Sequence, residues 1–309
     1  MLTWLVLKEK ASIGNRSTFT ISLLLHLHQE MENVLPLISV IITTRNESVH
    51  IGDCLTSIKN QRYPQENIEI IVVDNNSADA TTQIAGEYTS KIFNYGPERS
   101  AQRNFGVRQS HGKYILYLDA DMILNDYVIS ECVAKCENEG YAVVYIPERI
   151  TGEGFWIKVR DFERSFYNAT VIDCVRFVRR NVFLEAGGFD ETMTGPEDWD
   201  FDRKVLRHGK AGVIIAPIYH NEGKFNLKRY LAKKSYYSRA FSTYIQKWGK
   251  NDPVIRKQFG FPYRYFGVFC ENGKWKKFFG NIPLALGVYF LRALVGSSFV
   301  IEKIRRKNS

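Results

Sequence analysis

The chain has 309 residues, of which 45% are hydrophobic and 24% charged, a composition that suits one large folded domain with an appendage and excludes a disordered chain. Its five cysteines are odd in number and form no C-x-x-C pair, which argues against a disulfide framework or structural zinc and favours a reducing cytosolic setting. The net charge of +9 is uneven: residues 203–309 hold 23 Lys and Arg against 4 Asp and Glu, whereas residues 1–202 hold 19 against 29. The last third is therefore expected to meet an anionic partner.

The chain opens with two short apolar stretches, "MLTWLVLKEK" and "FTISLLLHLH". Neither has the basic flank of a signal peptide or the length of a membrane span. We expect residues 1–35 to be an appendage of doubtful order. Met31 stands shortly before the first predicted strand, so a start there is an alternative to Met1.

From residue 37 the pattern alternates between strands and helices. Continuous apolar, β-branched runs predict buried strands at 37–44, 68–77 and 114–124. Helical spacing and turn residues predict helices at 50–61, from about Asp79, and at 99–112. Strands separated by helices of this length indicate a parallel α/β sheet with right-handed connections.

Polar residues gather where these strands end. Asp74 follows the second strand, and Asp119 and Asp121 lie near the end of "YILYLDADMIL". Ligands bind at the carboxyl ends of strands in such sheets. A buried carboxylate is costly unless it is paired, and a bound cation would pair with it better than a salt bridge. The alternative is that Asp119 and Asp121 simply cap a turn.

Five motifs then point to one family: "ISVIITTRNE", "IEIIVVDNNSAD", "RSAQRNFGVRQSHGKYILYLDAD", "FDETMTGPEDWDFDRKVLRHG" and "IYHNEG". In order and spacing they resemble a family 2 glycosyltransferase over about residues 37–222. A Rossmann dinucleotide enzyme would need G-x-G-x-x-G after the first strand, where "TTRNES" stands instead. The resemblance implies an α/β fold of GT-A type, with a mainly parallel central sheet flanked by helices. We expect this domain at 36–222 and a basic, aromatic helical extension at 223–309.

The resemblance also implies a divalent cation, Mg²⁺ or Mn²⁺, which takes few protein carboxylates and otherwise water and phosphate oxygens. It makes Asp121 the direct metal ligand and places Asp119 near the ribose or behind the metal. His220, at the end of an apolar run, would be a further metal or diphosphate contact. A lone histidine in such a position is otherwise structural.

The catalytic base is expected in "TGPEDWDFDRKVLRHG". Pro196 and Gly209 bound a helix that begins near Glu197 and Asp198. A carboxylate at a helix N-terminus is held ionised by the dipole and is ready to accept a proton. By resemblance Asp198 is the base and Glu197 its catalytic neighbour. Apart from the resemblance, Glu197 and Asp198 would be ordinary acidic residues in the first turn of a helix.

The resemblance assigns a group of residues to the nucleotide sugar: Thr43, Arg45, Glu47, Asp74, Arg99, Arg103, Asp119 and Gly188. Asp74 would accept a hydrogen bond from the base; in an arbitrary protein "DNNS" would be an Asx turn, and both roles can hold together. Arg99 and Arg103 lie one helical turn apart and would reach a diphosphate, or are merely solvated. The backbone at Gly188 would approach the donor sugar.

After His220 basic residues alternate with Tyr, Phe and Trp, which suits a phospholipid surface or a lipid phosphate. RNA binding ranks low because no RRM, KH or OB signature appears. Residues 281–301 are long enough to span a bilayer, but Arg292 lies in the middle and basic residues flank both ends. We expect an interfacial helix first, a single span second and a buried core helix third.

Together these features predict a metal-dependent, inverting glycosyltransferase. It would move a sugar from a UDP- or GDP-sugar to a membrane-associated or lipid-linked acceptor. Its expected place is the cytoplasmic face of the membrane, peripheral or with one C-terminal span. The alternatives are a non-catalytic membrane-associated scaffold and a glycoside hydrolase, which also uses paired carboxylates but needs no nucleotide cradle.

Overall fold

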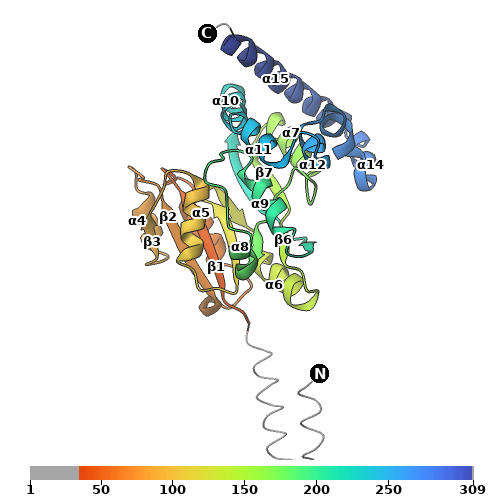
Figure 1. Ribbon diagram of the computed structural model, residues 1–309. Coiled ribbons are helices and arrows are strands. Elements are labelled where there is room, and N and C mark those ends of the chain that lie inside the picture. Colours follow the sequence, from red (N-terminus) through yellow and green to blue (C-terminus); the bar gives the residue numbers. More distant parts are fainter. Residues whose placement is uncertain (1–34, 308–309) are drawn as a thin grey trace, which may run out of the picture. The chain divides into compact units, whose positions relative to one another are not determined.

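Figure 1 shows the computed structural model of the chain, which describes residues 35–307. The expectations for the first 34 residues, including a start at Met31, lie outside the described residues. Contacts divide the chain after Pro36, and the compact unit that begins at Leu37 contains every element described below. The C-terminal helices belong to the same unit as the sheet.

A seven-stranded sheet forms the centre, in the order β3-β2-β1-β4-β8-β6-β9. In that order its strands are Ile92–Asn94, Ile68–Asp74, Ile38–Thr44, Tyr114–Asp119, Phe177–Arg179, Val143–Tyr145 and Ala211–Val213. The pairs among β1 to β4 are parallel, as is β6 with β9, whereas β8 runs antiparallel to both β4 and β6. The mainly parallel α/β sheet expected from the sequence is confirmed, with one antiparallel strand inside it.

The run at 114–124, expected to be one strand, is two. β4 ends at Asp119, and the chain turns before β5 (Met122–Leu124), which belongs to a second sheet with β10 (Ile218–Lys224) and β7 (Glu148–Glu153). A straight strand would carry Asp121 onward within a sheet that is buried on both faces, where its charge would lack a partner. The turn instead leaves Asp121 between the two sheets.

Helices cover both faces of the central sheet (Figure 1). One apolar core joins the sheet to α3 (Ile51–Lys59) and α6 (Val128–Asn138). A second core joins its other face to α5 (Arg99–Arg108), α8 (Arg180–Glu185) and α9 (Glu197–Val205). Successive strand residues alternate between the cores, as Ile41 and Ile42 do. Helices α3 and α5 match the predicted helices, although α5 ends four residues before Gly112.

The remaining elements are short or C-terminal: α4 (Thr81–Gly86), η1 (Gln65–Asn67), α7 (Phe155–Arg164), α10 (Leu227–Ser238), α11 (Phe241–Trp248), α12 (Pro253–Phe259), η2 (Tyr263–Gly267), α13 (Val268–Cys270), η3 (Glu271–Gly273), α14 (Trp275–Phe279) and α15 (Ile282–Lys307). A third apolar core joins α7, α13, α14 and α15. The extension expected to be helical is therefore helical, and it shares a core with α7 of the preceding region.

Arg292, the basic residue in the middle of the last apolar segment, is buried in α15. Its Nε donates to Glu163 Oε1 at 2.9 Å and its Nη2 donates to the Tyr167 hydroxyl at 2.8 Å. The charge is thus paired inside the protein, as a buried arginine requires. Among the described residues, no helix combines the length and apolar character that crossing a membrane would need.

Candidate functional site

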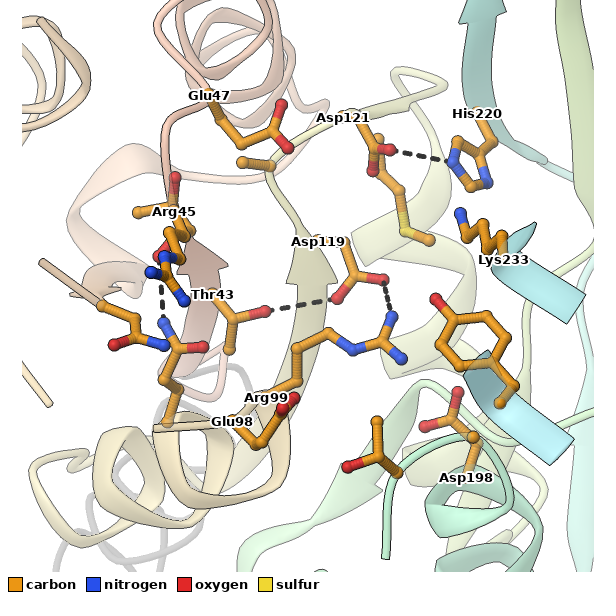
Figure 2. A pocket seen from close by; sticks show the side chains of 18 of the residues that line it. Thr43, Arg45, Glu47, Glu98, Arg99, Asp119, Asp121, Asp198, His220 and Lys233 are labelled. Atoms are coloured by element: carbon orange, nitrogen blue, oxygen red, sulfur yellow. Dashed lines mark hydrogen bonds and ion pairs between the residues drawn. The ribbon is translucent and has the colours of Figure 1, made fainter. Parts of the chain in front are cut away.

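A cavity of about 510 Å³ lies where the carboxyl ends of β1 and β4 face the second sheet (Figure 2). It brings together most of the residues singled out in the sequence: Thr43, Arg45, Glu47, Arg99, Asp119, Asp121, Asp198 and His220 all line it. These come from the β1–α3 loop, α5, the β4–β5 turn, α9 and β10. Residues far apart in the chain thus meet at the edge of the sheet where a ligand is expected.

Asp119 is held by arginines. Its Oδ1 accepts hydrogen bonds from Arg103 Nη2 at 2.9 Å and from the Thr43 hydroxyl at 3.2 Å, and Arg99 Nη1 lies 3.6 Å from Oδ2. Burial acts to raise the pKa of Asp119, but the charges of Arg103 and Arg99 outweigh it and hold the pKa well below its usual range. Salt bridges therefore pair with this carboxylate, and its expected place near the ribose or behind the metal stays a prediction.

Asp121 is only partly paired. Its Oδ2 faces His220 Nε2 at 2.9 Å, whereas its buried Oδ1 has no hydrogen-bond partner. Figure 2 shows Glu47 on the other side of this carboxylate from His220. Burial and the charge of Asp121 raise the pKa of Glu47. A carboxylate oxygen without a hydrogen-bond partner, with a second carboxylate beside it, fits a divalent cation at Asp121.

His220 lies within β10 and contacts two carboxylates. Its Nδ1 is 3.3 Å from Glu148 Oε1, on the side opposite Asp121. Burial acts to lower the pKa of His220, but the hydrogen bonds to Asp121 and Glu148 outweigh it and raise the pKa to about 10. Within residues 35–307, no group of three or more His, Cys, Asp or Glu side chains is placed to hold a metal ion. A cation at Asp121 would therefore also need oxygen atoms from substrate and water.

The acidic pair at the start of α9 divides between two environments. Asp198 lines the cavity, and its Oδ1 accepts from Arg103 Nη1 at 2.7 Å. Glu197 is 1% exposed, is not among the lining residues, and accepts from Arg99 Nη2 at 2.9 Å and from the Gly195 backbone. Burial, followed by the charge of Asp198, raises the pKa of Glu197. Of the two, Asp198 is the carboxylate that a substrate can touch.

The β1–α3 loop is tied to the loop after β2. Asn46 has a positive φ of 55° and donates its backbone N–H to the Ser77 hydroxyl at 2.8 Å. Its side-chain Oδ1 accepts from the Ala78 backbone, and the Glu47 backbone donates to the Thr81 hydroxyl, both at 2.8 Å. These bonds fix the loop that places Arg45 and Glu47 at the cavity.

Three residues predicted to contact the donor do not line the cavity. Arg103 is completely buried and pairs with Asp119 and Asp198. Asp74 does not line the cavity, and its carboxylate accepts from the Ser77 backbone at 2.8 Å and from the Ser77 hydroxyl, which is the Asx turn considered as the alternative. Gly188, with a φ of 65°, packs against Asn104 of α5, where an added Cβ would come within 2.5 Å of Asn104 Oδ1. Its close approach is to α5 and not to the cavity.

Several lining residues were not singled out in the sequence. α10 contributes Lys233, Tyr236 and Tyr237, which the composition of that segment had assigned to a membrane surface. The Tyr236 hydroxyl donates to Glu98 Oε1 at 2.9 Å, which links α10 to the start of α5. Arg176, 6% exposed, also lines the cavity. Helical spacing puts Lys233 and Tyr237 on one face of α10, but only the fold turns that face toward the cavity.

The chain was compared with known proteins. Residues 39–188 match the family model of Glycosyl transferase family 2. Glycosyltransferase AglE of Haloferax volcanii is 38% identical over 196 residues, which are 58% of this chain and 64% of AglE. The chain thus spans less than two thirds of the length of this relative.

Two solved structures resemble the fold. TarS 1-349 of S. aureus, in complex with UDP-GlcNAc, is 17% identical with a TM-score of 0.52, over 88% of this chain and 92% of that one. The mannosyltransferase PcManGT from Pyrobaculum calidifontis, in complex with GDP-Man and Mn²⁺, is 17% identical with a TM-score of 0.56, over 92% of this chain and 88% of that one. Residues 39–188 thus form a family 2 glycosyltransferase domain by the family match, and the likeness to these two structures shows a fold of the GT-A type.

Proposed function

We propose that the protein transfers a sugar from a UDP- or GDP-sugar to a hydroxyl group of a membrane-associated or lipid-linked acceptor, with inversion at the anomeric carbon. One observation carries the proposal: the cavity is lined both by Asp121, with its open oxygen, and by Asp198. Transfer needs positive charge at the leaving diphosphate and a base at the acceptor, and these two carboxylates would serve the two needs.

The donor would lie along the carboxyl ends of β1 and β4. The complexes of TarS with UDP-GlcNAc and of PcManGT with GDP-Man support a nucleotide sugar as the donor. Arg99 and Lys233 line the cavity and bring positive charge toward a diphosphate. The loop fixed through Asn46 would hold the nucleotide, with Thr43 and Arg45 at its edge.

Mg²⁺ or Mn²⁺, held by Asp121 with His220 beside it, would neutralise charge that develops on the leaving diphosphate. The Mn²⁺ in the PcManGT complex supports this cofactor. Arg103 and Arg99 fix Asp119 next to that position.

Asp198 would accept the proton of the acceptor hydroxyl as the new bond forms. The acceptor oxygen attacks the anomeric carbon while the bond from that carbon to the diphosphate oxygen breaks. Attack from the side opposite the leaving group inverts the configuration. Arg103 keeps the Asp198 carboxylate in a fixed orientation through a 2.7 Å hydrogen bond, so that the base is positioned before the acceptor arrives.

The acceptor is proposed to be membrane-associated because the chain's positive charge is concentrated in residues 203–309. α10, part of that region, lines the cavity. A peripheral protein at the cytoplasmic face of a membrane would use this charge to approach anionic lipid. No nucleic acid partner is proposed.

The test is a thermal-shift screen of the purified protein with UDP, GDP, CDP and dTDP, each with and without Mn²⁺. One nucleotide should raise the melting temperature, and Mn²⁺ should enlarge the increase. Hydrolysis or transfer of the matching nucleotide sugar then distinguishes an enzyme from a non-catalytic scaffold. A folded sample that responds to none of the four nucleotides would overturn the proposal.

A further inference from the structure

We propose that one face of the C-terminal helices docks onto an anionic lipid bilayer. The inference rests on the proposed membrane-associated acceptor and deepens it by naming the surface that meets the membrane. This docking face consists of exposed apolar side chains from α7, α14 and α15: Phe155, Trp275, Phe279, Ile282, Leu286 and Phe290.

The last helix is apolar on two sides. Ile282, Leu286 and Phe290 follow one another at four-residue spacing and are 50%, 64% and 52% exposed, so they form one stripe along α15. On the other side Val288 and Leu291 are buried in the third apolar core. One apolar side of α15 is thus packed against the rest of the protein. The other side keeps three large apolar side chains half-exposed, which marks an interaction surface.

Aromatic residues extend this stripe at both flanks. The Phe290 ring stacks with Trp156 of α7 at a centroid distance of 5.5 Å, and Trp156 meets Phe155 at 5.2 Å. On α14, Trp275 and Phe279 lie one turn apart and are 49% and 61% exposed. α14 contacts α15 and ends three residues before Ile282, so its exposed aromatic side chains lie close to the start of the stripe.

The positive charge around the docking face favours an anionic lipid surface as its partner. Lys276 lies over the Trp275 ring at 5.7 Å, and Lys158 is exposed one turn after Phe155. Apart from the buried and paired Arg292, residues 253–298 hold six Lys and Arg and only one acidic residue, Glu271. Large apolar and aromatic groups rimmed by lysines suit the interface of a bilayer with anionic head groups. A second copy of the chain would bring the same positive charge and is disfavoured.

The position of the face explains how a lipid acceptor would reach the site. α15 contacts α10 (Figure 1), and α10 contributes Lys233 and Tyr236 to the cavity. A membrane bound along α15 would therefore lie next to a wall of the cavity. The acceptor head group would enter the cavity while its lipid stays in the bilayer.

The experiment is co-sedimentation of the full chain with vesicles of phosphatidylcholine mixed with phosphatidylglycerol, and with vesicles of phosphatidylcholine alone. The test variant is Phe279→Ser with Leu286→Ser, two highly exposed positions of the face. The matched control is Ile215→Ser with Leu184→Ser, which removes exposed apolar groups (89% and 47% exposed) elsewhere. Thermal shift by the nucleotide is measured for every variant, and sedimentation velocity reports the oligomeric state.

We expect the wild type and the control to bind the anionic vesicles at low salt. The test variant should bind at least about tenfold more weakly, with its melting temperature and nucleotide response unchanged. The proposal is overturned if the wild type ignores anionic vesicles, if the test variant binds them like the wild type, or if the variant converts a wild-type dimer to a monomer. A missing nucleotide response would count against the proposed function alone.

Discussion

The guanidinium of Arg103 joins Asp198 to the end of β4. It is completely buried, donates through Nη1 to Asp198 at 2.7 Å and donates through Nη2 to Asp119 at 2.9 Å. One side chain therefore fixes the distance between the proposed base and the carboxylate at the proposed donor site. Arg103 touches neither reacting atom and acts as a positioning residue.

Arg103→Lys should separate charge from geometry, because lysine keeps the charge but not the planar fork that binds two carboxylates. We expect kcat to fall at least about tenfold, and the free energy of unfolding to fall by roughly 1–3 kcal/mol because a charged hydrogen bond is lost in a buried site. Steady-state kinetics and urea denaturation measure the two effects. The control is Arg108→Lys, at an exposed position on the same helix. Equal kcat in Arg103→Lys and wild type would contradict the positioning role.

Asp121→Asn and Asp198→Asn should both lower transfer, but at different steps. Without the Asp121 charge, the increase in nucleotide affinity that Mn²⁺ provides should disappear, which isothermal titration measures. Asp198→Asn keeps an oxygen to accept from Arg103, so donor binding should persist while kcat falls by about 10²–10⁴-fold. Near-normal turnover in Asp198→Asn would show that another group, such as Glu197, is the base.

Much of the site could be predicted because it follows the strand ends. The buried runs predicted the end of β1 at Thr44 and located β2 and β4, although the predicted strands ran past Asp74 and Asp119, and parallel strands bring their ends to one edge. What spacing could not give was local. Asp74 follows β2 and bonds Ser77 of its own turn, and Asp119 pairs with arginines from α5. Alternation and spacing do not show which of several nearby partners a carboxylate takes.

The contribution of α10 could not be predicted for a different reason. Its Lys and Tyr residues have the composition of a membrane surface, and the helix has no buried residue. Which way such a helix turns depends on distant contacts, such as that of Tyr236 with Glu98. Arg292 is a similar case, because its partner Glu163 lies 129 residues away. From the sequence alone, Arg292 argued against a membrane span but did not reveal that Glu163 is its partner.

Arg292→Met should destabilise the protein because it removes the nearer of two arginines that pair with the buried Glu163, while Arg160 stays 3.5 Å from its Oε2. We expect the free energy of unfolding to fall by about 1–3 kcal/mol, since a buried charged hydrogen bond is lost but Glu163 keeps a partner, as measured by urea denaturation. Adding Glu163→Gln to Arg292→Met should restore much of the loss, since no buried charge then remains unpaired. Losses that simply add in the double variant would mean that the two side chains do not interact.

Asp202 should make stability fall as pH rises. Burial raises its pKa to about 7, against hydrogen bonds from Tyr145 and Val175 that act to lower it. An unfolded aspartate titrates near about 4, so between about pH 4 and pH 7 the folded protein binds more protons. Its contribution to the free energy of unfolding then falls by roughly 2–4 kcal/mol across that window. Asp202→Asn should flatten this dependence in denaturation curves taken at several pH values, and an unchanged slope would exclude Asp202 as its source.

Lys233 lines the cavity although it lies beyond the 39–188 segment that matches the family model. Its side chain is exposed and lines the cavity, where its charge acts to lower the pKa of Asp121. An ammonium group placed there would offset charge that develops on the diphosphate, a type of contact whose loss typically costs about 10²-fold in kcat. Lys233→Met should therefore lower kcat while leaving the free energy of unfolding unchanged.

The matched control is Lys228→Met, which removes an exposed lysine from the first turn of the same helix, at a position that does not line the cavity. It lowers the net charge by the same amount, so any effect of overall charge on membrane binding is shared by the two variants. If kcat on a soluble acceptor falls only in Lys233→Met, the charge acts at the site. If both variants keep wild-type kcat on a soluble acceptor but lose activity on vesicles, the lysines of α10 serve membrane approach, and the diphosphate must be neutralised by the cation and the arginines that line the cavity, such as Arg99.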